Sequence, residues 1–205
     1  MNWHGSGPGA GEPGVRRIVL TGGPAAGKTV TADVLRLEYT DSVAVLPESA
    51  SILYNGGFPR GRAPQEHQLV QEAIYEVQGR LERIYAMHHP GLPHICDRGA
   101  LDGAAYWPGG LEPFLEAMET DIEREYGRYE QVIFLETSAW LEDAYTTEGS
   151  CRNETPAEAR KLDEILRQIW EQHPNLHVIR HEAHFSEKIP QVLRIIESVT
   201  GARRD

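Results

Sequence analysis

The stretch "TGGPAAGKT", residues 21–29, places three glycines, a proline and a lysine between two apolar segments. Residues 22–29 match the pattern Gly-x-x-x-x-Gly-Lys-Thr, in which the glycines let successive backbone N–H groups surround a phosphate chain. An apolar strand is expected before the pattern, over 16–22, and a helix after it, from Lys28 to about Tyr39. This is the context that a phosphate-binding loop requires.

Each part of this loop has a chemical role in binding a nucleotide. Lys28 would bring a positive charge to the outer phosphates, the helix beginning there would add its dipole, and the Thr29 hydroxyl would ligate Mg²⁺. The alternative is a Gly-rich turn that precedes a lysine by chance. Since Gly is about 7% of an average sequence, that coincidence has a frequency of roughly 1%. We therefore expect ATP or GTP with Mg²⁺, bound by Gly22, Gly23, Pro24, Ala25, Ala26, Gly27, Lys28, Thr29 and Val30.

The composition of the 205-residue chain limits the classes of partner. A formal net charge of -11 argues against nucleic-acid polymers, whose binding depends on neutralising many phosphates. No window approaches the roughly 20 apolar residues of a membrane span. Residues 1–14 are rich in Gly and Pro without the order of a secretory signal, so we expect a disordered leader and a single domain over 15–205. Two cysteines without a CxxC pair favour a reduced, cytoplasmic setting, and the oligomeric state stays open.

The rest of the chain predicts an α/β domain with a mainly parallel sheet. Four further apolar strands are expected, and helical periodicity separates them. One of these helices is expected from Leu111 to Tyr126, with a strongly acidic outer face. Helices should therefore cover both faces of the sheet, with ligands at the carboxyl ends of the strands. A capping box at residues 155–158 marks one helix start, whereas 138–155 is polar and has no clear assignment. The further strands are expected at 42–49, 93–99, 130–137 and 176–180.

Charged residues end two of these strands. Asp97 ends the third strand in "ICDRG" and is suited to anchor Mg²⁺, usually through water. Arg98 could bind a transferring phosphoryl group or orient a neighbouring carboxylate. Glu48 ends the second strand in "LPES", where it could accept the proton of an attacking hydroxyl, and Asp102 could share that role or bind substrate hydroxyls. The alternative for Asp97 and Arg98 is a turn that only caps the end of a strand, and the alternative for Glu48 is a solvated glutamate in a turn.

Further candidates lie in the loops and on the long helix. Arg152, in the stretch 138–155, could close over the phosphates as part of a lid that excludes water. Arg60 and Arg62 follow the second strand and could grip the acceptor, or could be solvated loop residues. Gln78 is expected on the long helix over about 65–87, where it could face the acceptor or belong to a polar outer face together with Glu82.

Four segments carry a resemblance to a known family: "GGPAAGKT", "PESAS", "CDRGALDGAAY" and "CRNETPAEARKLD". In this order they resemble small P-loop ATPase/kinase-like proteins known as AAA-type ATP-binding domains, over about residues 16–199. Nicotinamide riboside kinases and deoxynucleoside kinases are more distantly similar, in the Glu after the second strand and the Asp-Arg after the third. The resemblance implies a three-layer P-loop NTPase sandwich with strand order 2-3-1-4-5 and a lid around 138–155. It also implies the roles given above for Lys28, Thr29, Glu48, Asp97, Arg98 and Arg152.

Two functions fit these features. The first is a Mg²⁺-dependent kinase that moves the γ-phosphoryl of ATP or GTP to a hydroxyl of a nucleoside- or vitamin-like small molecule, with Glu48 as the base. The alternative is a GTPase-type switch that controls a partner. That function calls for Asn-Lys-x-Asp after the fourth strand, where the chain has "FLETSAW". It also calls for a DxxG after a strand, and none of the expected strands is followed by one. A ring-forming AAA+ motor needs a helical lid domain for which too few residues remain.

Overall fold

The computed structural model describes residues 15–61, 63–141, 154–181 and 187–204. The expected leader over 1–14, Arg62, Arg152 and most of the expected lid lie outside these residues. Within them, five strands form one sheet in the order β2-β3-β1-β4-β5, and every neighbouring pair is parallel. The strands are β1 (Arg17–Thr21), β2 (Ala44–Leu46), β3 (His94–Asp97), β4 (Gln131–Leu135) and β5 (Leu176–Ile179). The predicted fold class and strand order are confirmed.

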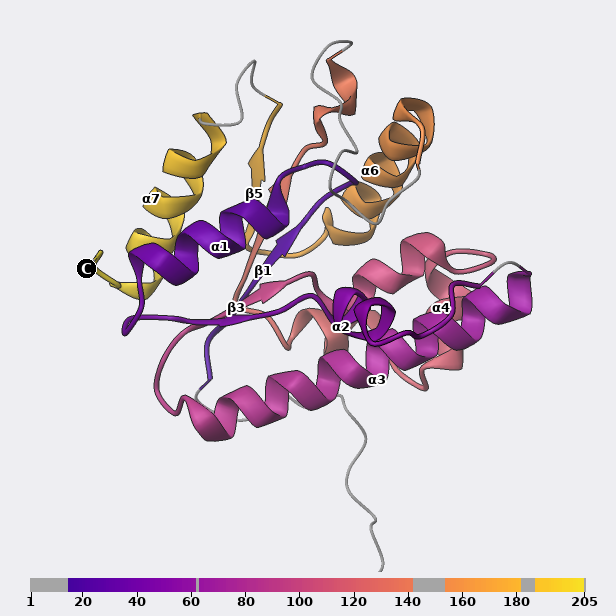
Figure 1. Ribbon diagram of the computed structural model, residues 1–205, viewed down its shortest axis with the longest axis horizontal. Helices are drawn as coiled ribbons and strands as arrows, with labels where there is room; N and C mark the ends of the chain where they lie inside the picture. Colours follow the sequence, from indigo (N-terminus) through magenta and orange to yellow (C-terminus); the bar gives the residue numbers. More distant parts are fainter. Residues whose placement is uncertain (1–14, 62, 142–153, 182–186, 205) are drawn as a thin grey trace, which may run out of the picture.

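Helices cover both faces of this sheet, as predicted. Helices α1 (Lys28–Glu38) and α7 (Lys188–Thr200) lie on one face. Helices α3 (Pro64–His88) and α6 (Pro156–Trp170) lie on the other, together with α4 (Leu111–Ala117), α5 (Ile122–Tyr126) and the 3₁₀ helix η1 (Ala100–Tyr106) (Figure 1). The short helices α2 (Ser49–Asn55) and η2 (Ser138–Trp140) follow β2 and β4.

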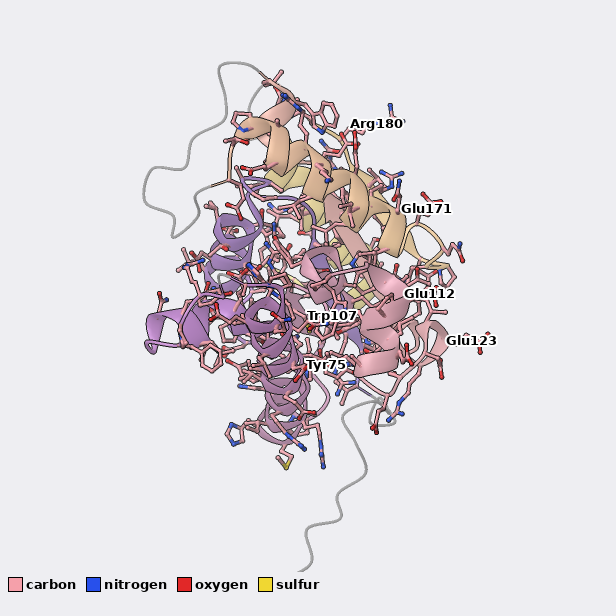
Figure 2. The ribbon with its side chains drawn as sticks, turned by 90° about the vertical axis from the view of Figure 1, so that its right-hand side faces the viewer. Tyr75, Trp107, Glu112, Glu123, Glu171 and Arg180 are labelled. Atoms are coloured by element: carbon pink, nitrogen blue, oxygen red, sulfur yellow. The ribbon has the colours of Figure 1, made fainter. Side chains whose placement is uncertain are left out.

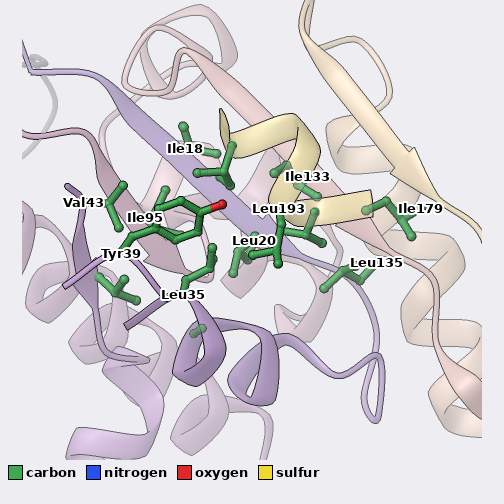
Figure 3. Close-up of a cluster of buried hydrophobic side chains, with 14 of the residues drawn as sticks. Ile18, Leu20, Leu35, Tyr39, Val43, Ile95, Ile133, Leu135, Ile179 and Leu193 are labelled. Atoms are coloured by element: carbon green, nitrogen blue, oxygen red, sulfur yellow. The ribbon is translucent and has the colours of Figure 1, made fainter. Parts of the chain in front are cut away.

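The alternation of side chains along β1 divides the core between the two faces. Ile18 and Leu20 pack toward α1 and α7, in a cluster that includes Leu35 and Leu193 (Figure 3). Val19 points the other way, into the cluster formed with α3, α4 and α6. Because β1 is central and buried on both faces, its carboxyl end can deliver the loop at residues 22–27 to the middle of the sheet edge.

Two segments differ from the expectations. The expected helix through Leu111 and Tyr126 is divided into α4 and α5, because Glu119 adopts φ 51° and Asp121 begins a new helix by accepting a hydrogen bond from the Arg124 N–H at 2.8 Å. The expected second strand, 42–49, ends at Leu46, and α2 begins at Ser49. Helices α2, α4 and α5 have five to seven residues each, too few to show a helical period by themselves.

The acidic outer face expected for this region is present. Glu112, Glu123 and Glu171 project outward, whereas Tyr75 and Trp107 point into the molecule (Figure 2). The rings of Tyr75 and Trp107 each meet Phe114 edge to face, at centroid distances of 5.8 Å and 5.5 Å. None of the described helices is both long enough and apolar enough to cross a membrane.

Candidate functional site

The loop between β1 and α1 has a backbone that depends on its glycines. Gly22 and Gly27 have φ values of 130° and 89°, and Ala25 has 56°. A Cβ on Gly22 would lie 1.9 Å from the carbonyl oxygen of Leu135 on β4, so any other residue would clash with the backbone. Gly27 is the N-cap of α1, which therefore points its amino end into the loop.

Lys28 lies folded against this loop. Its side chain is buried, and Nζ donates hydrogen bonds to the carbonyl oxygens of Gly22 and Gly23, both at 2.7 Å. The ammonium group is therefore held against the loop carbonyls, next to the amino end of α1. The contact of Lys28 with the outer phosphates stays a prediction.

Asp163 on α6 connects the phosphate-binding loop to the segment after β4 by hydrogen bonds, a role that was not predicted from the sequence. Its Oδ1 accepts hydrogen bonds from the N–H groups of Gly23 (2.8 Å) and Thr137 (3.1 Å). Thr137 also donates through its hydroxyl to the Pro24 carbonyl. Burial raises the pKa of Asp163, and the two backbone N–H groups oppose that shift. Asp163 shares its helix face with buried Ala159 and Leu166, and an acid on an apolar face is the signal that could have revealed it.

Asp97, at the end of β3, faces Thr29 at the start of α1. Asp97 is 2% exposed and accepts a hydrogen bond from the Thr29 side chain. Among the residues that the structure describes, its Oδ1 atom has no hydrogen-bond partner. Burial raises the pKa of Asp97, as does the charge of Glu48, while Lys28 and Arg98 lower it.

This pair fits a hard divalent cation. A buried carboxylate oxygen without a partner is costly, and Mg²⁺ prefers oxygen ligands such as a carboxylate and a hydroxyl. The described residues contain no cluster of three or more His, Cys, Asp or Glu that could hold a metal. The remaining ligands would thus be water and phosphate oxygens, as Mg²⁺ usually keeps them.

Glu48 and Arg98 form an ion pair although 50 residues separate them. Arg98 Nε donates to Glu48 Oε1 at 2.6 Å, and the Ser51 hydroxyl donates to the other carboxylate oxygen at 2.5 Å. Both side chains are about 10% exposed. Arg98 has φ 84°, a conformation that costs a non-glycine residue about 1–3 kcal/mol and that occurs often at functional sites.

Asp102 completes this group from the buried side. Its Oδ2 atom lies 3.3 Å from Arg98, and its carboxylate also accepts hydrogen bonds from the Thr21 hydroxyl (2.9 Å) and from Trp170 Nε1 (2.8 Å). These contacts join β1, η1 and α6 and orient Arg98. The prediction that Asp102 contacts the acceptor stays a prediction, but its oxygens already have three protein donors.

A cavity of about 730 Å³ brings the two halves of the site together. The phosphate-binding loop contributes one wall and α2, α3 and η1 contribute the other. Arg60 lies at this cavity, exposed, with its guanidinium 4.2 Å from the Tyr54 ring centre. The predicted site residues that line the cavity are Pro24, Ala25, Gly27, Lys28, Thr29, Val30, Glu48, Arg60, Gln78, Arg98 and Asp102.

The placement of Gln78 and Glu82 corrects one expectation. The alternative to acceptor binding was that both residues belong to a polar outer face of the helix. Both side chains are instead buried, with 3% exposed. Gln78 donates to Glu82 and to the Arg98 carbonyl and accepts from Ser49. Its amide hydrogens therefore have protein partners, and the prediction that Gln78 binds the acceptor stays a prediction. The buried face of α3 carries polar residues, Gln71, Gln78 and Glu82, among apolar ones, and the apolar period of Val70 and Ile74 does not show this.

Fold and loop define a P-loop nucleotide-binding protein of the NTPase class. The family model of the AAA domain matches residues 17–188, and the chain belongs to this family. The comparison with curated proteins gave no match.

Solved structures show the same fold. One is the deoxyadenosine kinase from M. mycoides, described with products dCMP and a flexible dCDP bound. It is 12% identical, has a TM-score of 0.62, and the match covers 89% of this chain and 99% of that chain. At this identity the likeness concerns the fold, that is, the arrangement of the sheet and its helices.

Proposed function

We propose that this protein is a Mg²⁺-dependent kinase that transfers the γ-phosphoryl group of ATP or GTP to a hydroxyl of a small molecule, nucleoside- or vitamin-like. One observation carries the proposal: the Glu48–Arg98 pair, joined at 2.6 Å, lines the same cavity as Lys28 and Thr29. A carboxylate and a cation thus face the position where a phosphate chain would end. Phosphoryl transfer depends on such positioning and charge stabilisation.

The loop side would bind the nucleotide. Backbone N–H groups of the 22–30 segment would surround the phosphates, except at Pro24, which has no N–H, and at Gly23, whose N–H donates to Asp163. Lys28 would exchange its loop carbonyls for phosphate oxygens. Thr29 and Asp97 would hold Mg²⁺, which supplies neutralisation of phosphate charge when bound. The buried Asp97 oxygen, which has no hydrogen-bond partner among the described residues, supports this role.

The other side would bind the acceptor and activate it. Glu48 would accept the hydroxyl proton, while Arg98 would hold both that carboxylate and the charge of the transferring group. Arg60 lies at the same cavity and could contact the acceptor. Arg152 and Arg62 keep their proposed roles, in a lid and at the acceptor, on the strength of the sequence.

The wider assignments are also proposals. The M. mycoides kinase is described with deoxynucleotide products, which favours a nucleoside-like acceptor over other alcohols. The net charge of -11 argues against a nucleic-acid polymer, whereas a local cradle of N–H groups can bind a small anionic ligand whatever the overall charge. Cys96 is a buried free cysteine, in keeping with the proposed reduced cytoplasmic setting.

The test is a search for acceptor-dependent turnover. The protein is incubated with Mg²⁺ and ATP, then GTP, against a panel of nucleosides and vitamins, and nucleoside diphosphate release and phosphorylated product are followed. We expect release that requires one class of acceptor. Glu48→Gln should keep nucleotide binding and lower turnover about a hundredfold, the scale of a lost general base. Slow release that ignores every acceptor would instead support the nucleotide-dependent switch.

A further inference from the structure

We propose that Gln78 is a positioning residue: its buried amide fixes Glu48 and Arg98 relative to each other through Ser49 and the Arg98 carbonyl. The proposal rests on the kinase function only for its effect on turnover. It assigns Gln78 to the catalytic pair instead of to the acceptor.

The amide of Gln78 meets both segments that carry the pair. The Ser49 hydroxyl, next to Glu48, donates to its Oε1 at 2.6 Å. Its Nε2 lies 3.4 Å from the Arg98 carbonyl oxygen and 3.0 Å from Glu82 Oε1. Both N–H hydrogens and the oxygen of the amide are therefore used, so the side chain links the start of α2 to the turn after β3.

This arrangement has only one orientation. If the amide were turned by 180°, its oxygen would face a carbonyl oxygen and a carboxylate, neither of which can donate a hydrogen. The partners thus determine the amide orientation without ambiguity. A group held in this way can transmit its position to its neighbours, because it has no alternative set of hydrogen bonds.

Glu82 anchors the bridge in a buried charge cluster. Its carboxylate accepts hydrogen bonds from Arg128 Nη2 at 2.9 Å and from the Tyr129 hydroxyl at 2.8 Å, and Arg17 of β1 lies 3.7 Å away. All four side chains are almost fully buried. The bridge is therefore attached to the centre of the fold, because hydrogen bonds from Arg128 and Tyr129 hold Glu82 there.

The catalytic pair needs such support. Arg98 lies in a left-handed conformation that its surroundings must impose, and Glu48 precedes a helix of only seven residues. The pairing of β2 with β3 ends at Leu46 and Cys96, two residues before Glu48 and Arg98, which leaves the ends of these two segments some freedom to move. The second link through Gln78 removes that freedom.

The test compares Gln78→Met with Gln65→Met, an exposed position in the first turn of the same helix. Met keeps the length of the side chain and removes the hydrogen bonds. We expect Gln78→Met to lower kcat roughly ten- to a hundredfold, the scale of a misplacement near 1 Å, with both KM values nearly unchanged. Gln65→Met should match the wild type. Ser49→Ala removes one contact and should lower kcat less, which keeps the test valid if Gln78→Met folds poorly.

A double variant separates positioning from packing. In a Glu48→Gln background, Gln78→Met should lower kcat little further. Gln78 acts through the Glu48–Arg98 ion pair, and the Glu48→Gln substitution has already removed that pair. A full additional loss would overturn the proposal. So would an unchanged kcat with lowered thermal stability, which indicates packing alone, or a raised acceptor KM with unchanged kcat, which indicates an acceptor contact.

A spectroscopic measurement makes the proposal independent of the kinase assignment. In ¹⁵N-labelled protein, the Arg98 Nε–H resonance, assigned through Glu48→Gln, reports the 2.6 Å bond to Glu48. Gln78→Met should shift it and speed its exchange with water, whereas Gln65→Met should not. An unshifted resonance would contradict the bridge. If no acceptor supports turnover in the wild type, the kinase proposal fails while this measurement still decides the role of Gln78.

Discussion

The two walls of the cavity are built in different ways. The phosphate-binding wall depends on backbone: glycines with positive φ, an amino-terminal helix end and a lysine folded over neighbouring carbonyls. The opposite wall depends on side chains from distant segments, such as Glu48 and Arg98, which meet at 2.6 Å across 50 residues. The first wall is a local property of nine residues. The second exists only once the sheet and α3 are in place.

The largest expected effect breaks the backbone wall. Lys28→Ala should abolish nucleotide binding, because it removes the positive charge held against the loop carbonyls that is expected to bind the outer phosphates. Titration calorimetry with ATP and GTP measures this directly. Lys161→Ala, an exposed position on α6, serves as control and should bind as the wild type does. Retained binding in Lys28→Ala would remove the basis for placing phosphates in this loop.

The same contrast explains what the sequence could predict. The loop at residues 21–29 and the position of Glu48, Asp97 and Arg98 at the carboxyl ends of their strands could be predicted because motif and topology determine them. The strand order followed from the family resemblance. The roles of Gln78 and Asp163 were not predicted, since each depends on how a helix is rotated against its neighbours. The boundaries of α2 also escaped, because seven residues show no helical period.

The next effect concerns Asp97, the carboxylate proposed to hold Mg²⁺. Because burial raises the pKa of Asp97 above 3.8, the folded protein binds this proton more tightly than the unfolded chain does. Its contribution to stability is present at low pH and is lost as the pH rises through the raised pKa. Asp97→Asn should therefore raise the Tm of the nucleotide-free protein at neutral pH, and the gain should vanish in acid. Thermal unfolding of both proteins across the acid range measures this, and an equal Tm at neutral pH would contradict it.

Mg²⁺ binding should show the opposite preference. The ion needs the ionised carboxylate, so affinity for Mg²⁺–ATP should fall as the pH drops through the raised pKa of Asp97. Asp97→Asn should bind Mg²⁺–ATP weakly and without that dependence on pH. Calorimetry at several pH values, with and without Mg²⁺, measures both. An Asp97→Asn variant with wild-type affinity would place the metal elsewhere.

A smaller effect tests how far the backbone wall depends on support from α6. Asp163→Ala leaves the Gly23 and Thr137 N–H groups without their acceptor, at a cost of about 1–3 kcal/mol for each buried donor. Stability should fall, and nucleotide affinity should fall less than in Lys28→Ala, because the charge of Lys28 remains. Urea unfolding and calorimetry distinguish the two quantities. Glu164→Ala, the next position on α6, is the control.

The smallest effect is expected at the mouth of the side-chain wall. Arg60 is exposed and stacks on Tyr54, where such a contact contributes about 0.5–1 kcal/mol. Arg60→Ala should leave nucleotide binding and stability nearly unchanged. If Arg60 contacts the acceptor, Arg60→Ala should raise the acceptor KM several-fold. Arg80→Ala, at an exposed arginine on α3, is the control and should raise it less. Equal KM values in the two variants would assign Arg60 to the solvated loop and leave α3, η1 and Glu48 to bind the acceptor.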